Sequence, residues 1–173
     1  MTSVIAGKYK GRKLVDIKNL HVRPTQAKVR KSIFQILEPF NNLEVLDLYA
    51  GMGTLGIEAL SRGASKVVFV EKNRKVFKVL KKNIDLFEPE NSYLFLDDVN
   101  GYLKRVKNHF FDIVLADPPY SEVSFESIQK ATKHFLKPGG ILCVEMQKEN
   151  INQEDIRIKY YGNTQVVFWR NVA

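Results

Sequence analysis

The run Asp117-Pro118-Pro119-Tyr120 combines a carboxylate, two prolines and an aromatic ring, which together can activate an amino group for attack. An exocyclic amino group of a nucleobase is a weak nucleophile because its lone pair is delocalised into the ring. If the Asp117 carboxylate and the Pro118 carbonyl accept its hydrogens, the nitrogen can pyramidalise, and Asp117 can also take the departing proton. Tyr120 can stack on the base and orient it. We predict Asp117, Pro118 and Tyr120 as catalytic residues, although the run by itself would also suit a simple turn.

A glycine-rich turn lies upstream of this loop. Gly51, Gly53 and Gly56 match the pattern G-x-G-x-x-G between a strand pattern and a helix pattern, which is the context that gives this motif meaning. Glycine allows the backbone to approach a ligand closely, and the start of the helix supplies free N–H groups. Glu71 closes the next strand pattern about 20 residues later, where it can accept hydrogen bonds from ribose hydroxyls. The sequence therefore predicts a nucleotide-type ligand.

Two ligand classes fit such a turn, and Asp47 separates them. A nicotinamide dinucleotide would place its pyrophosphate at the helix start, where the Asp47 carboxylate is a poor neighbour. The same carboxylate suits the cationic amino group of S-adenosylmethionine, which we predict as the cofactor. Asp97 and Asp98 follow the third strand pattern, and one of them can accept a hydrogen bond from the adenine amino group. Asp98 could also cap the helix that follows, and an acid can do both.

Strand and helix patterns alternate from residue 44 onward. Such alternation requires right-handed crossovers and a parallel sheet covered on both faces, so the fold class is α/β. Near the end of the chain the alternation stops, and two strand patterns are joined by a short turn. This predicts an antiparallel hairpin and seven strands in all. The predicted strands are 45–48, 66–70, 93–96, 112–116, 141–145, 156–160 and 165–169, and the predicted helices between them are 54–62, 74–87, 99–106 and 125–135.

Residues 1–22 are predicted to form a basic N-terminal extension to a catalytic domain over residues 23–173. Segments 4–6 and 12–17 could pair as a β-hairpin across a glycine-bounded turn. Thr25 can cap a helix that runs to about residue 37 and ends before Pro39.

The charge of the chain is concentrated in the same region. The net charge of the 173 residues is +8, and residues 1–31 hold nine basic side chains against one acid, so the remainder is neutral. A local excess of Lys and Arg indicates a polyanionic partner, although a solvated basic tail is the simpler alternative. Arg23 and Arg30 could either contact RNA or hold the helix against the sheet. The predicted RNA-contacting residues are Lys8, Lys10, Arg12, Lys13, Arg23 and Arg30.

Other classes of protein are disfavoured by composition. Cys143 is the single cysteine, so no internal disulfide can form, and it lies in an apolar run typical of a buried strand. No Cys/His cluster has the spacing of a zinc site, and no apolar stretch is long enough to span a membrane. We expect a cytoplasmic, metal-free monomer.

The motifs together resemble those of the bacterial 16S ribosomal RNA guanine-N2 methyltransferase family, over nearly the whole chain. The resemblance implies a class I methyltransferase fold, catalysis by Asp117 and Tyr120, and a guanine extruded from a folded small-subunit RNA within an assembling subunit. It further implies S-adenosylmethionine bound by Asp47, Tyr49, Gly51, Gly53, Glu71 and Asp98. Met52 departs from the small residue common at that position. The runs that carry the resemblance are 4–14, Arg23-Pro24-Thr25 with Val29-Arg30 and Phe34, 45–51, 55–64, Glu71, Asn83 and 117–120.

Three alternatives differ in the target or in the class of protein. Methyltransferases of adenine N6 or of protein glutamine share the two motifs, but their loop commonly begins with Asn and a target-recognition region is often present. A non-catalytic RNA-binding protein could retain the fold, and a nicotinamide oxidoreductase could use the glycine turn.

Overall fold

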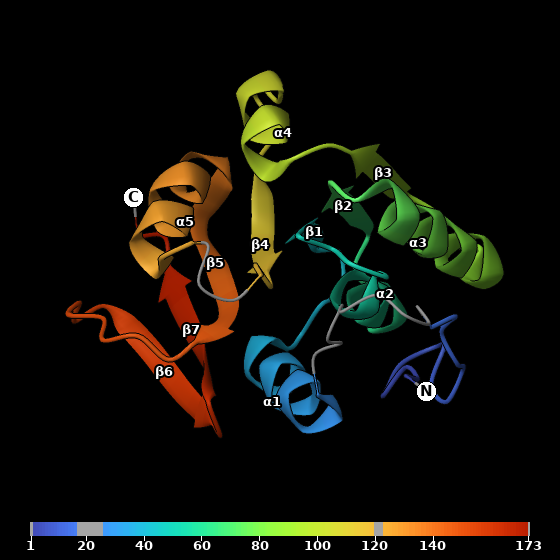
Figure 1. Ribbon diagram of the computed structural model, residues 1–173, viewed down its shortest axis with the longest axis horizontal. Helices are drawn as coiled ribbons and strands as arrows, with labels where there is room; N and C mark the ends of the chain where they lie inside the picture. Colours follow the sequence, from blue (N-terminus) through green and yellow to red (C-terminus); the bar gives the residue numbers. More distant parts are fainter. Residues whose placement is uncertain (1, 17–25, 120–122, 173) are drawn as a thin grey trace.

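The predicted strand–helix alternation is confirmed by the computed structural model, in which seven strands form one sheet (Figure 1). The structure describes residues 2–16, 26–119 and 123–172. The strand order is β3-β2-β1-β4-β5-β7-β6; the first five strands in the chain run parallel, and β7 runs antiparallel to both β5 and β6. The strands are β1 (Glu44–Leu48), β2 (Lys66–Glu71), β3 (Ser92–Leu96), β4 (Phe111–Ala116), β5 (Leu136–Gln147), β6 (Ile156–Tyr161) and β7 (Thr164–Arg170).

Helices cover both faces of the sheet (Figure 1). One face carries α1 (Ala27–Leu37), α2 (Thr54–Ser61) and α3 (Arg74–Phe87). The other carries α4 (Val99–Arg105) and α5 (Phe125–Thr132), which continues into the 3-10 turn η1 (Lys133–Phe135). Because both faces are covered, the central strands are apolar at nearly every position, and successive residues of a strand enter opposite cores.

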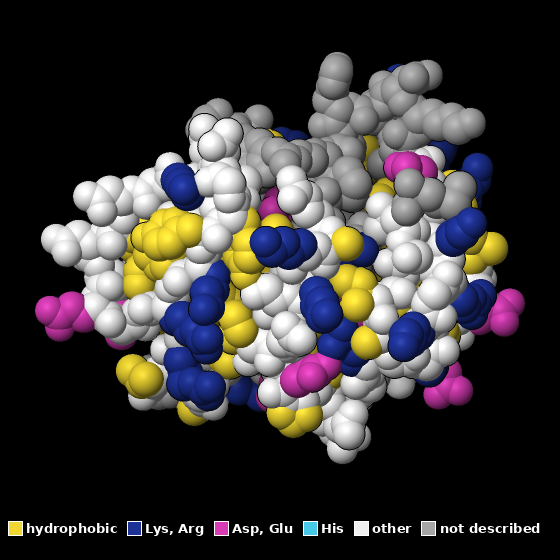
Figure 2. Space-filling view, turned by 90° about the horizontal axis from the view of Figure 1, so that it is seen from below, with side chains coloured by type: hydrophobic (Ala, Val, Ile, Leu, Met, Phe, Trp, Pro, Cys, Tyr) yellow, Lys and Arg dark blue, Asp and Glu magenta, His cyan; other side chains and the backbone are white. Residues whose placement is uncertain are grey.

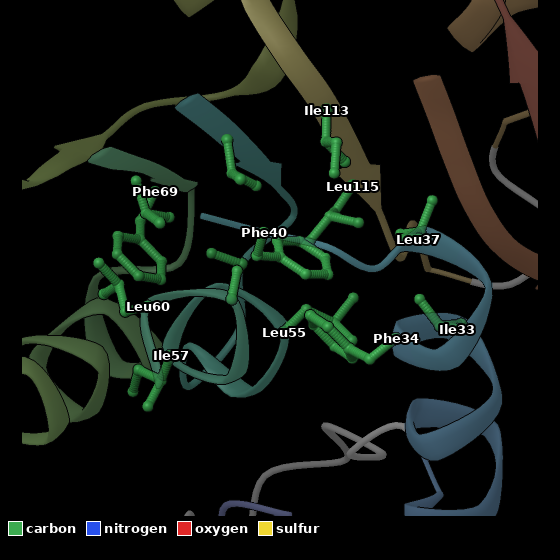
Figure 3. Packing of buried hydrophobic residues seen from close by; sticks show 14 of the residues in the cluster. Ile33, Phe34, Leu37, Phe40, Leu55, Ile57, Leu60, Phe69, Ile113 and Leu115 are labelled. Atoms are coloured by element: carbon green, nitrogen blue, oxygen red, sulfur yellow. The ribbon is translucent and has the colours of Figure 1, made fainter. Parts of the chain in front are cut away.

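The core on the α1–α3 side is built from both helices and sheet. Figure 3 shows Phe34 of α1 and Leu55 of α2 directed towards the same apolar region as Leu115 of β4. Phe40, on the connection from α1 to β1, fills the space between them and is fully buried. This packing fixes α2, which carries the glycine turn at its start, against the sheet.

Several boundaries differ from the sequence expectation. Strand β5 begins at Leu136 rather than 141, because Pro138, Gly139 and Gly140 are accommodated where the β4–β5 register shifts. Its irregular start is held by the backbone of Asn171, which accepts from Gly139 N at 2.7 Å and donates from its own amide to Gly140 O at 2.8 Å. The predicted helix over 125–135 ends at Thr132 and tightens into η1. Helix α1 begins at Ala27, and Thr25, its predicted cap, lies outside the described residues.

The N-terminal extension pairs as predicted but forms no full strands within its described residues, 2–16. Ser3 and Lys13 make an isolated antiparallel bridge, and Val4 N donates to Arg12 O at 3.0 Å. The ladder stops there because the amides of Ile5 and Ala6 donate to the Glu58 carboxylate of α2 instead of to the opposite segment. The buried apolar side chains of the extension, Val4, Tyr9 and Leu14, join the α1–α3 core, and the boundary proposed at residue 22 lies outside the described residues.

Candidate active site

The carboxyl ends of the parallel strands bring the predicted site residues to one edge of the sheet. Leu48 of β1 is level with Val70 of β2 and with Ala116 of β4. The residues that follow, Glu71 and Asp117 among them, therefore lie on either side of the turn that leaves β1. This is the position where open α/β sheets bind ligands.

The glycine turn adopts the backbone that its sequence requires. Tyr49, Gly51 and Gly53 have φ of 57°, 58° and 88°, all in the left-handed region that glycine adopts without steric cost. Tyr49 adopts it despite its side chain, a strained conformation of the kind that clusters at functional sites. Gly53 then caps the start of α2. Within the turn, Gly51 N is directed towards Glu71, and Gly53 N closes the turn by donating to Ala50 O at 2.8 Å.

Gly56 provides the close contact between α2 and the sheet. A Cβ at this position would overlap the Phe69 ring and lie 2.9 Å from Asp47 Oδ2. Its absence lets Gly56 N donate to Asp47 Oδ2 at 2.8 Å. Asp47 is only 1% exposed, and burial raises the pKa of its carboxyl to about 7, with Glu71 adding to the rise and the Gly56 hydrogen bond opposing it. An ionised Asp47 would therefore be stabilised by a cation in the turn.

Glu71 joins the end of β2 to the turn. Its Oε2 accepts from Gly51 N at 3.0 Å and its Oε1 accepts from Asn73 N at 2.7 Å. Asn73 in turn caps α3 by accepting from Lys75 N at 2.9 Å and from Val76 N at 3.3 Å. The Glu71 carboxylate is thus held next to Gly51, where it could accept hydrogen bonds from the ribose hydroxyls of a ligand.

Asp97 and Asp98 both have structural contacts. Asp98 caps α4, as its position allows, by accepting from Gly101 N at 3.0 Å. Asp97 pairs with Arg105, and its amide donates to Glu71 O at 3.1 Å. Both acids lie next to the end of β3, so the adenine contact stays a prediction for Asp98, with Asp97 as its neighbour.

Met52, the departure from the family pattern, is buried, and its backbone is fixed by Asn83. The Asn83 side-chain amide donates to Met52 O at 3.0 Å and to Val15 O at 3.2 Å, while its oxygen accepts from Val15 N at 2.7 Å. One fully buried side chain therefore ties the glycine turn to the N-terminal extension.

The predicted catalytic loop leaves β4 at the same edge. Asp117 is partly buried, Pro118 is buried and Pro119 is exposed, whereas Tyr120 lies outside the described residues. Asp117 directly follows Ala116, which is level with Leu48 at the start of the glycine turn, and its catalytic role stays a prediction.

Glu145 is a candidate site residue that sequence reasoning missed. It follows Cys143 on β5 as Asp117 follows Leu115 on β4, and Leu115 pairs with Cys143. Leu115 and Cys143 both face the α1–α3 core, so Asp117, just past the end of β4, and Glu145, within β5, lie level with each other on that face. Burial raises the pKa of the Cys143 thiol well above its usual range, and the nearby charges of Glu145 and Asp117 raise it further. The signal was present in the sequence, since Glu145 is the acid at the end of the predicted strand 141–145, although β5 itself continues to Gln147.

The basic residues of the extension lie at the surface. Lys8, Lys10, Arg12 and Lys13 are exposed. The Arg12 guanidinium lies 4.6 Å from the Phe87 ring centroid and donates to Leu86 O at 2.5 Å, so the extension is seated on α3. In Figure 2, Lys and Arg side chains spread over the face that carries the lower elements of Figure 1, with few acidic side chains among them.

Arg30 differs from these surface cations. It is 3% exposed, and its guanidinium donates to Ser3 O at 3.0 Å. Burial lowers the pKa of Arg30, while the charge of Glu58 opposes that change. The sequence left open a contact with RNA or a role in holding the helix against the sheet; the burial of Arg30 favours a structural role, and its contact with Ser3 holds α1 to the extension rather than to the sheet. Arg23 lies outside the described residues.

Comparison with known proteins places the chain in a family. The family described as "Conserved hypothetical protein 95" matches residues 2–170. The chain belongs to this family. Its relatives include "Ribosomal RNA small subunit methyltransferase D" of Haemophilus influenzae, 34% identical over 96% of this chain and 91% of that protein. The protein of the same name from Escherichia coli is 31% identical over 85% of this chain and 75% of that protein.

Solved structures agree with this assignment. "Putative methyltransferase yhhF from Escherichia coli" superposes with a TM-score of 0.85 at 28% identity, covering 98% of this chain and 97% of that one. The fold of this family member is the class I methyltransferase fold, as predicted, and its cofactor is S-adenosylmethionine. In the described part of the chain no helix is long and apolar enough to cross a membrane, and no cluster of three or more His, Cys, Asp or Glu could hold a metal ion.

Proposed function

We propose that this methyltransferase transfers a methyl group from S-adenosylmethionine to the exocyclic N2 amino group of a guanine in 16S ribosomal RNA. The observation that carries the proposal is the placement of Asp117-Pro118 directly beside the glycine turn, at the carboxyl edge of β1 and β4. The two relatives named above, from Haemophilus influenzae and Escherichia coli, are small-subunit ribosomal RNA methyltransferases by name, which supports ribosomal RNA as the target.

The cofactor-binding residues are proposed from the donors and acceptors at this edge. Glu71 accepts hydrogen bonds from the ribose hydroxyls in place of those it now accepts from Gly51 and Asn73. The buried Asp47 carboxylate neutralises the positive charge of the amino group in the methionine portion. Asp98 accepts a hydrogen bond from the adenine amino group. The turn residues Tyr49, Gly51 and Gly53 approach the cofactor through their backbone. When bound, S-adenosylmethionine supplies an electrophilic methyl group on a sulfonium centre.

The catalytic residues act on the amino group of the base. Asp117 and the carbonyl of Pro118 accept its two hydrogens, which localises the nitrogen lone pair and directs it along the line of attack. Asp117 then removes the proton as the nitrogen becomes methylated. Tyr120 stacks on the base, which is extruded from the folded RNA at a cost of a few kcal/mol.

A second carboxylate at Glu145 favours guanine over adenine. The Watson–Crick edge of guanine presents two neighbouring donors, N1–H and N2–H₂, whereas adenine presents an acceptor at N1. Asp117 and Glu145 lie level with each other on one face of the neighbouring strands β4 and β5, so two acceptors would meet the two donors of guanine. An adenine N1 facing Glu145 would place an acceptor against the buried Glu145 carboxylate, also an acceptor, which costs free energy.

The basic extension is proposed to hold the RNA. Its exposed side chains, Lys8, Lys10, Arg12 and Lys13, attract phosphates without reading sequence. The extension is anchored to α2 through Glu58, so RNA held at its surface stays next to the catalytic domain. We propose a monomer acting in the cytoplasm on RNA of an assembling small subunit.

Methyl transfer to defined substrates tests the proposal. The protein is incubated with labelled S-adenosylmethionine and either free 16S RNA or immature small subunits, and the nucleosides are analysed after digestion. We expect label in N2-methylguanosine. Label in N6-methyladenosine or in protein would contradict the proposed target, and a comparison of the two substrates shows which assembly stage is methylated.

A further inference from the structure

Helix α3 presents a row of basic side chains that neither the fold nor the catalytic site uses. Its buried side is apolar apart from Asn83. The basic side chains on its opposite side lie within an arc of about 120°, calculated at about 3.6 residues per turn. The residues of this row are Arg74, Lys75, Lys78, Lys81 and Lys82, and all five are exposed.

The positive charges of this row destabilise helix α3. Lys78 has a like charge four residues away on each side, at Arg74 and Lys82, and such pairs destabilise a helix. Arg74 and Lys75 also stand in the first turn, where the helix dipole disfavours cations, and no acid occupies that turn. Among the residues that the structure describes, none of the five forms an ion pair that would offset these repulsions. A binding role explains a charge pattern that folding does not favour.

The row connects two parts of the molecule already assigned to the reaction. The row begins next to Asn73, whose backbone N–H donates to Glu71, a proposed cofactor-binding residue at the carboxyl edge of the sheet. It ends near Leu86, to which Arg12 of the extension donates, and Figure 1 shows the N-terminal segment beside α3. From Arg74 to Lys82 the helix rises about 12 Å, at about 1.5 Å per residue. The acid Asp85 on the same side marks the end of the row.

We propose that the basic row of α3 binds the phosphate backbone of the RNA substrate and carries the strand from the N-terminal extension towards the cofactor edge. A linear array of Lys and Arg matches the regular negative charge of a phosphodiester chain and carries no sequence information. This inference rests on the proposed function for the identity of the polyanion, and it adds a helix to the surface that binds it.

A charge-removing variant of α3 tests the inference. In K78Q/K81Q/K82Q the substituted side chains are exposed and leave the buried side of α3 intact. The matched control is K104Q/K107Q/K133Q, which removes three exposed lysines from the α4–α5 side. We expect the α3 variant to bind a 16S RNA fragment at least ten times more weakly than the parent. The slope of log K against log salt should decrease by about 2 to 3, because each neutralised phosphate contributes about 0.7 to 0.9 to that slope.

Two further measurements separate binding from folding. The melting temperature of the α3 variant should equal or exceed that of the parent, because repulsion is removed, and its affinity for S-adenosylmethionine should be unchanged. The conservative variant K78R/K81R/K82R should retain RNA affinity.

The inference and the proposed function can fail separately. If the parent methylates guanine in RNA while the α3 variant keeps the parent's RNA affinity and salt slope, the role of α3 is wrong and the function stands. Equal losses of affinity in the control variant would also overturn the role of α3, since the effect would then reflect net charge alone. Label in another nucleoside from the parent overturns the proposed target without bearing on α3.

Discussion

The buried carboxyl of Asp47 makes the stability of the protein depend on pH in a way that a single substitution should abolish. Its folded pKa is raised to about 7 from the usual 3.8, chiefly by burial. A raised pKa means that the folded state holds the proton more tightly than the unfolded chain. The stabilisation is therefore complete below pH 3.8, decreases as the pH rises, and is lost above about pH 7.

The size of the effect follows from this difference in pKa. Each pKa unit corresponds to about 1.36 kcal/mol, so the full difference is worth about 4 kcal/mol. Between pH 5 and pH 8 the free energy of unfolding should fall by about 2.5 kcal/mol through Asp47 alone, since the curve flattens above about pH 7. Asp47→Asn keeps an oxygen that can accept from Gly56 N but carries no charge. The variant should therefore lose this pH dependence.

Urea unfolding of the parent and of Asp47→Asn at pH 5, 6, 7 and 8 measures how the free energy of unfolding of each protein depends on pH. Titrations shared by the two proteins cancel in the comparison, and Asp85→Asn, at an exposed position of α3, controls for the loss of a carboxylate. Parallel curves for parent and Asp47→Asn would refute the reasoning. Below about pH 7 the parent's affinity for S-adenosylmethionine should also rise with pH, by up to about tenfold per pH unit, because the cationic amino group prefers ionised Asp47. In Asp47→Asn the affinity should be lower and independent of pH.

Three further outcomes test other contacts. Asp117→Ala should leave the affinity for S-adenosylmethionine, measured by calorimetry, nearly intact while turnover collapses. Equal losses of affinity and turnover would instead assign Asp117 to the cofactor site. Gly56→Ala should destabilise the protein by about 1 to 3 kcal/mol, measured by thermal unfolding, because the added Cβ would overlap the Phe69 ring, and an unchanged melting temperature would contradict that packing. The last test compares RNA that carries guanine with RNA that carries 2-aminopurine, which lacks N1–H, at the target position. Glu145→Gln should slow methylation of guanine more than methylation of 2-aminopurine. Equal effects on the two bases would show that Glu145 has no role in base recognition.

The sheet and the position of the main motifs were predictable from the sequence because both depend on local patterns. Strand patterns separated by amphipathic helices permit few topologies, and the rule that ligands bind at the carboxyl edge places Asp117 beside Gly51 without any knowledge of contacts. The bounds of β5 were missed because Pro138-Gly139-Gly140 resembles a loop. Gly139 and Gly140 are held in the strand by hydrogen bonds with the backbone of Asn171, which is remote in sequence.

The roles of side chains were harder to predict where they depend on tertiary packing. Arg30 lies among cations in the sequence, and only the folded chain shows that its side chain is buried and that its guanidinium reaches Ser3 O. Asn83 gives no local sign that it joins Met52 to Val15. The basic row of α3 is present in the sequence, but acids elsewhere in residues 32–173 cancel its charge, so the net charge of that region does not reveal it.

On the proposed function, the distribution of charge over the folded chain explains how the enzyme would attract RNA and yet admit only a base. Asp47, Glu71, Asp117 and Glu145 lie at or near the carboxyl edge of the sheet, so a phosphate entering it would meet buried or partly buried carboxyl groups. Cations lie instead on the extension and on α3, at the sides of that edge. RNA held by its backbone at these surfaces can satisfy the acids only by offering hydrogen-bond donors. The amino edge of the extruded guanine that we propose as the target would offer such donors without bringing its phosphate into the site.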